Sequence, residues 1–172
     1  DGVVFENDIT ITAQSIEISN IEIRKGAFSI LPHSHAVLPD SGNIIVRNCI
    51  FNDRETRVKN GINITFENCF SRGFIIEKSK NVTIRHCTII SQQRGLSQSA
   101  ALWIDGDGVN IFESIIYGDY LGVIFSDKGK NVKRESDIRT DRGINIVDTL
   151  LYGEQGLCAF QFEDKPLDEK NF

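Results

Sequence analysis

The sequence predicts an all-β solenoid, in which one short strand-and-turn unit is stacked on itself about six times. Three observations predict it. Ile, Val and Phe dominate the apolar residues of the 172-residue chain, which has no Met and three Pro, and branched and aromatic side chains suit a pleated, half-buried surface. Apolar residues alternate with polar ones in short segments. Six of these segments align without a gap, which indicates a repeat architecture.

The repeated unit is nine residues long. Its second position is Ile or Val and its fourth is Ile, Val or Phe in every copy, so each copy is expected to be a strand with one face on a core. The spacing between copies ranges from 18 residues (Cys69 to Cys87) to 35 residues (Ser114 to Thr149), which indicates turns of variable length. The six copies are residues 15–23, 43–51, 63–71, 81–89, 108–116 and 143–151.

A second apolar strand is expected between the later copies, at 73–76, 101–104, 121–125 and 157–160. The last two coils align over their whole length at one offset, which places Tyr117 on Tyr152 and Val123 on Cys158. The fold class predicted is therefore a right-handed single-stranded parallel β-helix. We expect one domain over residues 1–172, which can be an excised segment of a longer protein, with its core repeats in 15–162.

The unit N-V-x-I-x-N-C-x-I, carried by residues 43–51 and 81–89, resembles the pectin lyase-like right-handed parallel β-helix superfamily. The resemblance covers roughly residues 15–162 and implies the architecture. That superfamily includes polysaccharide lyases, glycoside hydrolases, epimerases, phage tailspikes and noncatalytic surface proteins, so the resemblance leaves the activity open.

Composition excludes some classes of partner. The formal net charge is −5, and the basic residues are dispersed, whereas a nucleic-acid surface needs a basic patch or stripe. No apolar run approaches eighteen residues, so we expect no membrane span. No basic-then-apolar leader is present in this chain, and a secreted or cell-surface location is the expectation that follows from the resemblance alone.

Cysteines and histidines offer two candidate clusters. Cys49, Cys69 and Cys87 share the seventh position of the repeat, where packing of reduced, buried thiols explains them better than disulfides. His33 and His35 have a spacing that places two imidazoles on one side of an extended segment, which would suit a metal. A polar loop between two prolines explains the same histidines without a metal.

Two carboxylates, Asp105 and Asp107, form the candidate catalytic pair, in what we expect to be a tight turn. Such a pair can bind Ca²⁺ or act as acid and base, and lyases of the resembled fold combine Ca²⁺-binding acids with an Arg or Lys base. Asp and Gly are also what any tight turn would use. The base candidates are Arg94, Lys128 and Lys130.

Long turns are expected at 31–42, 52–60, 91–99 and 126–142, where binding residues of a solenoid collect. An aromatic strip is the candidate glycan-binding site, because sugar rings stack on aromatic faces. The same tyrosines could instead shield the edge of the core. The strip and the carboxylates beside it are Trp103, Tyr117, Asp119, Tyr120, Tyr152 and Glu154.

Three functions remain open on the sequence. The first is a module that binds, or presents a surface to, an extended polysaccharide or cell-surface glycan; it requires no cofactor. The second is a carbohydrate-active enzyme. A polysaccharide lyase is favoured over a glycoside hydrolase or epimerase, because the Asp-Asp and Gly-His-Gly motifs of polygalacturonases are missing. Ca²⁺ is the candidate ion for the lyase. The third is a purely structural repeat section, and the oligomeric state is open in all three.

Overall fold

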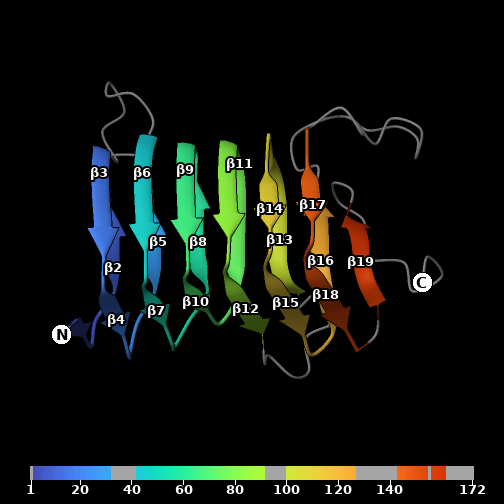
Figure 1. The fold of residues 1–172 in the computed structure, drawn as a ribbon, viewed down its shortest axis with the longest axis horizontal. Coiled ribbons are helices and arrows are strands. Elements are labelled where there is room, and N and C mark those ends of the chain that lie inside the picture. The colour runs from blue at the N-terminus through green and yellow to red at the C-terminus, as the bar shows by residue number, and fades with distance from the viewer. Residues whose placement is uncertain (1, 32–41, 92–99, 127–142, 155, 162–172) are drawn as a thin grey trace.

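The computed structural model in Figure 1 describes residues 2–31, 42–91, 100–126, 143–154 and 156–161. Within these ranges every element is a strand and every pair of neighbouring strands is parallel. The described chain is therefore all-β, and its stacked parallel strands are consistent with a solenoid. It contains no helix that could span a membrane.

A seven-stranded sheet forms one wall of the stack. Its strands, in spatial order, follow the order of the chain, so each turn of the chain adds one strand to the same edge. They are β1 (Val3–Phe5), β4 (Ile21–Ile23), β7 (Ile50–Phe51), β10 (Phe70–Ser71), β12 (Thr88–Ser91), β15 (Ile115–Gly118) and β18 (Leu150–Gly153).

A curled twelve-stranded sheet forms the rest of the wall, and its two halves meet in one long strand, β11 (Phe74–Arg85). The start of β11 pairs with β8 and β13, and its end pairs with β9 and β14. One half contains β2 (Ile9–Ile11), β5 (Phe28–Ile30), β8 (Thr56–Lys59), β13 (Ala100–Asp107), β16 (Leu121–Ser126) and β19 (Gly156–Gln161), and the other contains β3 (Gln14–Ser19), β6 (Gly42–Arg47), β9 (Ile62–Glu67), β14 (Asn110–Phe112) and β17 (Asn145–Val147).

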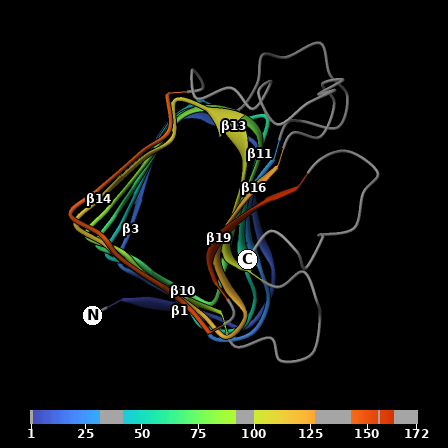
Figure 2. The same ribbon diagram turned by 90° about the vertical axis from the view of Figure 1, so that its right-hand side faces the viewer.

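The core lies inside the outline that the stacked strands trace in Figure 2. The parallel register places residues of the same kind beside one another in neighbouring strands. Ile44, Ile64 and Val82 lie side by side on consecutive strands in this way, and all three are fully buried. Phe28 and Phe51 stack with their ring centroids 4.6 Å apart. Full burial of each such side chain stabilises the fold by about 1.5–3 kcal/mol. The predicted inward second and fourth positions are confirmed.

Each nine-residue unit is two strands and not the single strand predicted, because a corner lies at its sixth residue. That residue has a positive φ in all six copies, so the chain leaves the twelve-stranded sheet there and enters the seven-stranded one. Asn tolerates this left-handed backbone better than most residues. The sixth residues are Asn20 (φ 58°), Asn48 (51°), Asn68 (53°), His86 (52°), Glu113 (47°) and Asp148 (48°).

Side-chain ladders connect the corners of successive rungs. The Asn68 side-chain amide donates to Asn48 Oδ1 at 2.7 Å. At the other corner, the first residue of each unit, Asn81 donates to Asn63 at 3.0 Å and Asn63 donates to Asn43 at 3.1 Å. These residues also have a positive φ, so asparagine there fits the backbone and pairs with its neighbour in the next rung.

Candidate functional site

The candidate catalytic carboxylates lie in a strand and not in the tight turn predicted for them. Asp105 and Asp107 are both in β13, and the chain turns only at Gly108, whose φ is 66°. Gly106, between them, is there because a Cβ at that position would lie 2.6 Å from the Ser79 carbonyl oxygen. The composition that predicted a turn therefore reflects close contact between rungs.

Alternation along β13 puts both carboxylates on the same side of the strand. Asp105 is 6% exposed and lies beside Glu77 in the register of β11, and Glu77 in turn forms an ion pair with Lys59 at 3.0 Å. Asp107 is half-buried and lies beside Lys80. The structure thus keeps the pair together and places it in a polar column that crosses three rungs.

The other predicted catalytic and metal residues lie outside the described residues. These are the base candidates Arg94, Lys128 and Lys130 and the metal candidates His33 and His35. In the part of the chain that is described, no three His, Cys, Asp or Glu side chains are grouped so that they could hold a metal ion. The long turn predicted at 52–60 is shorter than expected, because residues Thr56–Lys59 form β8.

Tyr117 and Tyr152 come together on the outer side of the seven-stranded sheet. They are register partners in β15 and β18, and their rings stack at a centroid distance of 5.0 Å and an interplanar angle of 9°. The Tyr117 hydroxyl donates to Glu154 Oε1 at 3.4 Å. Because the rings cover each other's inner faces, a ligand meets ring edges and hydroxyls there and not a row of open faces.

Each tyrosine of the pair is followed, two residues later in the sequence, by an acidic residue of the predicted strip. Tyr-Gly-Asp at 117–119 lies on Tyr-Gly-Glu at 152–154, with Gly118 paired to Gly153. A Cβ at Gly118 would overlap the Leu121 carbonyl oxygen, so the turn after the tyrosine accepts only glycine. Burial raises the pKa of the Tyr117 hydroxyl, and the negative charges of Glu154 and Asp119 raise it further.

Trp103 and Tyr120 belong to a different part of the surface. Both are half-buried and pack against Leu121 and Ile124, in a small apolar cluster separate from the main core. Trp103 lies in β13 of the twelve-stranded sheet, whereas the two stacked tyrosines lie in the seven-stranded sheet. The predicted strip is therefore divided into a tyrosine pair and a Trp103–Tyr120 cluster.

Apolar residues surround the tyrosine pair and extend it into a larger patch. Ile115 is 44% exposed, Leu150 is 64% exposed and Tyr152 is 45% exposed, and all alternate with inward residues of β15 and β18. Exposed apolar patches mark interaction sites more often than single exposed residues do. We call this patch the outer tyrosine face; its members are Thr88, Ile90, Ile115, Tyr117, Leu150 and Tyr152.

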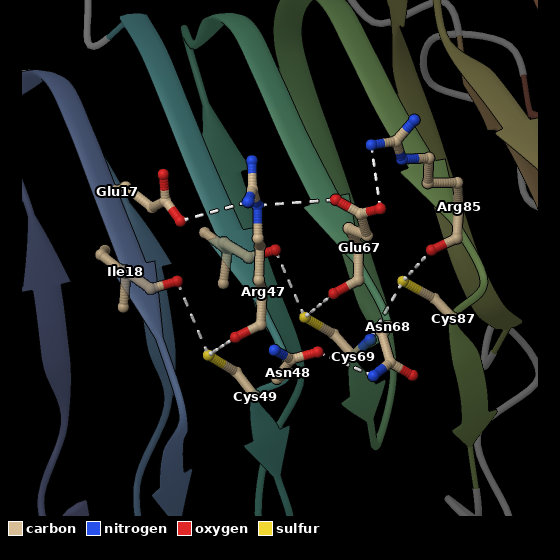
Figure 3. A network of polar contacts seen from close by, with 11 residues as sticks. Glu17, Ile18, Arg47, Asn48, Cys49, Glu67, Asn68, Cys69, Arg85 and Cys87 are labelled. Atoms are coloured by element: carbon tan, nitrogen blue, oxygen red, sulfur yellow. Dashed lines mark hydrogen bonds and ion pairs between the residues drawn. The ribbon is translucent and has the colours of Figure 1, made fainter. Parts of the chain in front are cut away.

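The cysteine column has a role that the sequence reading missed. The three thiols are buried and free, as predicted, and each also donates to the backbone of its own corner: Cys49 Sγ to Arg47 O at 3.0 Å, Cys69 Sγ to Glu67 O at 3.3 Å and Cys87 Sγ to Arg85 O at 3.2 Å (Figure 3). Ser114 and Thr149 make the same contact further along the column, at 2.7 and 2.9 Å. The occurrence of Cys, Ser and Thr at one position was the signal for a donor.

Interactions between neighbouring thiols shift their pKa values in opposite directions. The interaction with Cys69 and burial raise the pKa of Cys49, whereas the interaction with Cys69 lowers the pKa of Cys87 against the effect of burial. The interaction with Cys49 lowers the pKa of Cys69, but the interaction with Cys87 and burial together raise it to about 12. The column is a structural ladder, because no polar ligand can reach side chains that are this well buried.

Figure 3 also shows an ion-pair ladder on the outside of the same rungs. Arg47 lies 3.4 Å from Glu17 and 3.5 Å from Glu67, and Arg85 lies 2.9 Å from Glu67 on the other side. The hydrogen bond from Arg85 lowers the pKa of Glu67, and the charges of Arg85 and Arg47 add to the effect. Alternating charges account for these residues without a ligand.

Two hollows open on the N-terminal rungs. The larger, of about 850 Å³, is lined by residues that include Asp8, Lys25 and Asp53. Asp8 accepts a hydrogen bond from the Ala27 amide at 2.8 Å, and Asp53 accepts one from the Gly26 amide at 2.7 Å. The smaller, of about 390 Å³, lies between β1 and the neighbouring corners. Neither hollow contains a residue predicted to bind or react.

Comparison with known proteins adds no assignment. No protein-family model matches the sequence, and no curated protein matches it significantly.

Proposed function

We propose that the chain is a right-handed single-stranded parallel β-helix of about six coils, with the architecture of the pectin lyase-like superfamily. The repeated passage from the seven-stranded sheet through both halves of the curled sheet supports this reading. The hand follows from the general preference of parallel crossover connections, of which about 98% are right-handed. In the same proposal the protein works at a cell surface or outside the cell, as other glycan-binding modules of this architecture do.

The function proposed for this β-helix is binding of an extended polysaccharide along the outer tyrosine face. The observation that carries the proposal is the stacked pair of the half-buried Tyr117 and the exposed Tyr152 on the outer side of a sheet, where nothing in the core requires them. The outer tyrosine face covers three strands, β12, β15 and β18, of a seven-stranded sheet. With strands about 4.8 Å apart the whole sheet is about 30 Å long, so an extended polymer can continue along it beyond the face. Aromatic edges and hydroxyls beside carboxylates suit the mixed apolar and hydroxyl surface of a sugar.

A panel of immobilised polysaccharides tests this proposal. The wild-type chain is expected to bind at least one polymer of the panel, and Tyr152→Ala to weaken that binding about tenfold, because it removes the more exposed ring of the pair. Val147→Ala is the matched control, since Val147 has the same exposed fraction, 45%, and lies on β17 of the other sheet. Equal loss in both variants, or no binding to any polymer, would refute the assignment.

Catalysis by Asp105 is the second candidate, and one observation favours it. A carboxylate that is 6% exposed and lies beside Glu77 is an unusual residue for a β-strand. In this proposal the protein is a polysaccharide lyase, and a bound Ca²⁺ would neutralise the acidic substrate. Ultraviolet absorbance of unsaturated products, measured on a panel of uronic-acid polymers with and without Ca²⁺, tests it. No product across the panel would leave binding, or a purely structural role, as the function.

A further inference from the structure

Negative charge collects on the rungs of β15 and β18, which carry the tyrosine pair of the outer tyrosine face. Among the described residues from 100 to 161 there is no Lys, Arg or His, whereas the described rungs before them are rich in basic side chains. The acidic residues of these last rungs are Asp105, Asp107, Glu113, Asp119, Asp148 and Glu154. Asp119 and Glu154 follow the two tyrosines directly, so the part of a polymer that lies on β15 and β18 meets two negative charges beside the tyrosine pair.

Glu154 is the carboxylate placed closest to the tyrosine pair. Its Oε1 accepts from the Tyr117 hydroxyl, and its backbone amide donates to the Gly118 carbonyl at 3.3 Å, which fixes the residue at the edge of the sheet. The Glu154 side chain is exposed. The hydrogen bond from Tyr117 occupies one acceptor position of the carboxylate, which can accept about four hydrogen bonds. Because the side chain is exposed, its remaining capacity to accept hydrogen bonds is open to solvent.

Carboxylate acceptors discriminate between classes of glycan. They accept hydrogen bonds from sugar hydroxyls or amino groups, and these charge-assisted bonds are stronger than neutral ones. They repel the carboxylates or sulfates of an acidic polymer, because like charges that face each other are unfavourable. Burial raises the pKa of the Tyr117 hydroxyl, and the charges of Glu154 and Asp119 add to that effect.

We infer that the outer tyrosine face selects a non-acidic polysaccharide, one that offers hydroxyl or amino donors and no carboxylate or sulfate, and that Glu154 is the residue that selects it. The inference rests on the proposed polysaccharide-binding function and adds the class of ligand. It separates the binding function from the lyase alternative, whose substrates are acidic.

Affinity electrophoresis of the full chain through three polymers tests the inference: a neutral β-linked glucan, a glucosamine polymer and a polyuronate. We expect retardation by the neutral polymer, by the glucosamine polymer, or by both, and none by the polyuronate. Added salt distinguishes the two donor chemistries, because it weakens binding to amino groups and leaves binding to hydroxyls nearly unchanged.

Two variants then test the role of Glu154. Glu154→Gln keeps the shape of the side chain and removes its charge, and we expect it to weaken binding of the retained polymer roughly three- to tenfold, the difference between a charged and a neutral hydrogen bond. Asp148→Asn is the control, since it removes one charge from the same rung at a corner where asparagine fits the backbone. Equal affinities of the two variants would overturn the role of Glu154.

The possible failures of the two proposals can be told apart. Retardation by the polyuronate as strong as by the neutral polymer overturns the ligand class and leaves polysaccharide binding intact, provided that Tyr152→Ala still weakens it. Retardation by none of the three polymers, in a sample whose circular dichroism shows folded β-structure, overturns both the ligand class and the proposed function.

Discussion

Replacing Cys69 tests whether the seventh position of the repeat is selected for packing or for hydrogen bonding. Cys69 is buried, and its Sγ lies 3.3 Å from the Glu67 carbonyl oxygen and 3.5 Å from that of Val46. Ser114 occupies the same position in a later copy and donates to the Phe112 carbonyl at 2.7 Å. If donation matters, Cys69→Ser should be the mildest change, Cys69→Ala intermediate and Cys69→Val the worst.

The expected losses of unfolding free energy follow from what each substitution removes. Serine keeps the donor and replaces sulfur with a smaller oxygen, at a cost of about 1 kcal/mol. Alanine loses the hydrogen bond, about 1 kcal/mol, and leaves a small cavity that costs about 1 kcal/mol more. Valine loses the same bond and adds a branched methyl group to a filled column, so its total cost is about 2–4 kcal/mol.

Urea unfolding measures these differences. The transition would be followed by far-ultraviolet circular dichroism and by the fluorescence of the single tryptophan, Trp103, because coincident transitions are needed before a free energy is assigned to a repeat protein. Ile84→Val, which removes one methylene from the fully buried Ile84, calibrates the scale at about 0.5–1.5 kcal/mol. A valine variant as stable as wild type, with a less stable serine variant, would show that packing alone governs the column.

Three further predictions use the same unfolding assay. Asn68→Val should cost about 1–2 kcal/mol more than Asn68→Gly, because glycine adopts the φ of 53° without strain and valine does not. Equal costs would contradict the left-handed backbone at this corner. The pKa of Glu67 is lowered by Arg85, so this carboxylate contributes stability above its unfolded pKa and loses it as the pH falls through its folded pKa. Glu67→Gln should therefore have a midpoint that falls less on acidification than the wild-type midpoint, and parallel falls would rule the contribution out. Gly118→Ala should cost at least about 2 kcal/mol, since its Cβ would overlap the Leu121 carbonyl oxygen. Gly143→Ala is the control: a Cβ there meets only Gly108 atoms 3.7 Å or more away, so alanine should cost about 1–2 kcal/mol for its φ of 64°. Equal costs would mean that the turn at Gly118 is not crowded.

The stack of strands could be predicted from sequence because each rung repeats the burial of its neighbour. Parallel register places Ile64 between Ile44 and Val82, so one inward column appears in the sequence several times. Even the corner was present in the pattern. Inward residues occupy positions two and four and then seven and nine of each unit, and this change from even to odd marks the place where the chain turns between sheets.

The candidate catalytic site was predicted less well, because a glycine-rich segment of a solenoid can reflect either a turn or a crowded strand. An Asp-Gly-Asp-Gly sequence is typical of a turn, yet Gly106 is small because the backbone at Ser79 passes close by in the neighbouring rung. Contact between rungs is set by how segments stack, and the stacking offset varies from one copy to the next. Local composition alone therefore could not separate a turn from a crowded strand.

Outward positions are the place to look for function, because stacking does not specify them. Most outward repetition has a structural cause: asparagines repeat at corners because the backbone there has a positive φ, and charges alternate between Arg47 and Glu67 because they pair. The unit Tyr-Gly-acid repeats on β15 and β18 as well, and crowding by the next turn explains only its glycine. Neither the core nor a corner requires the tyrosine or the acid that follows it. Tyr117, Tyr152 and Glu154 are therefore the residues on which the proposed binding function rests.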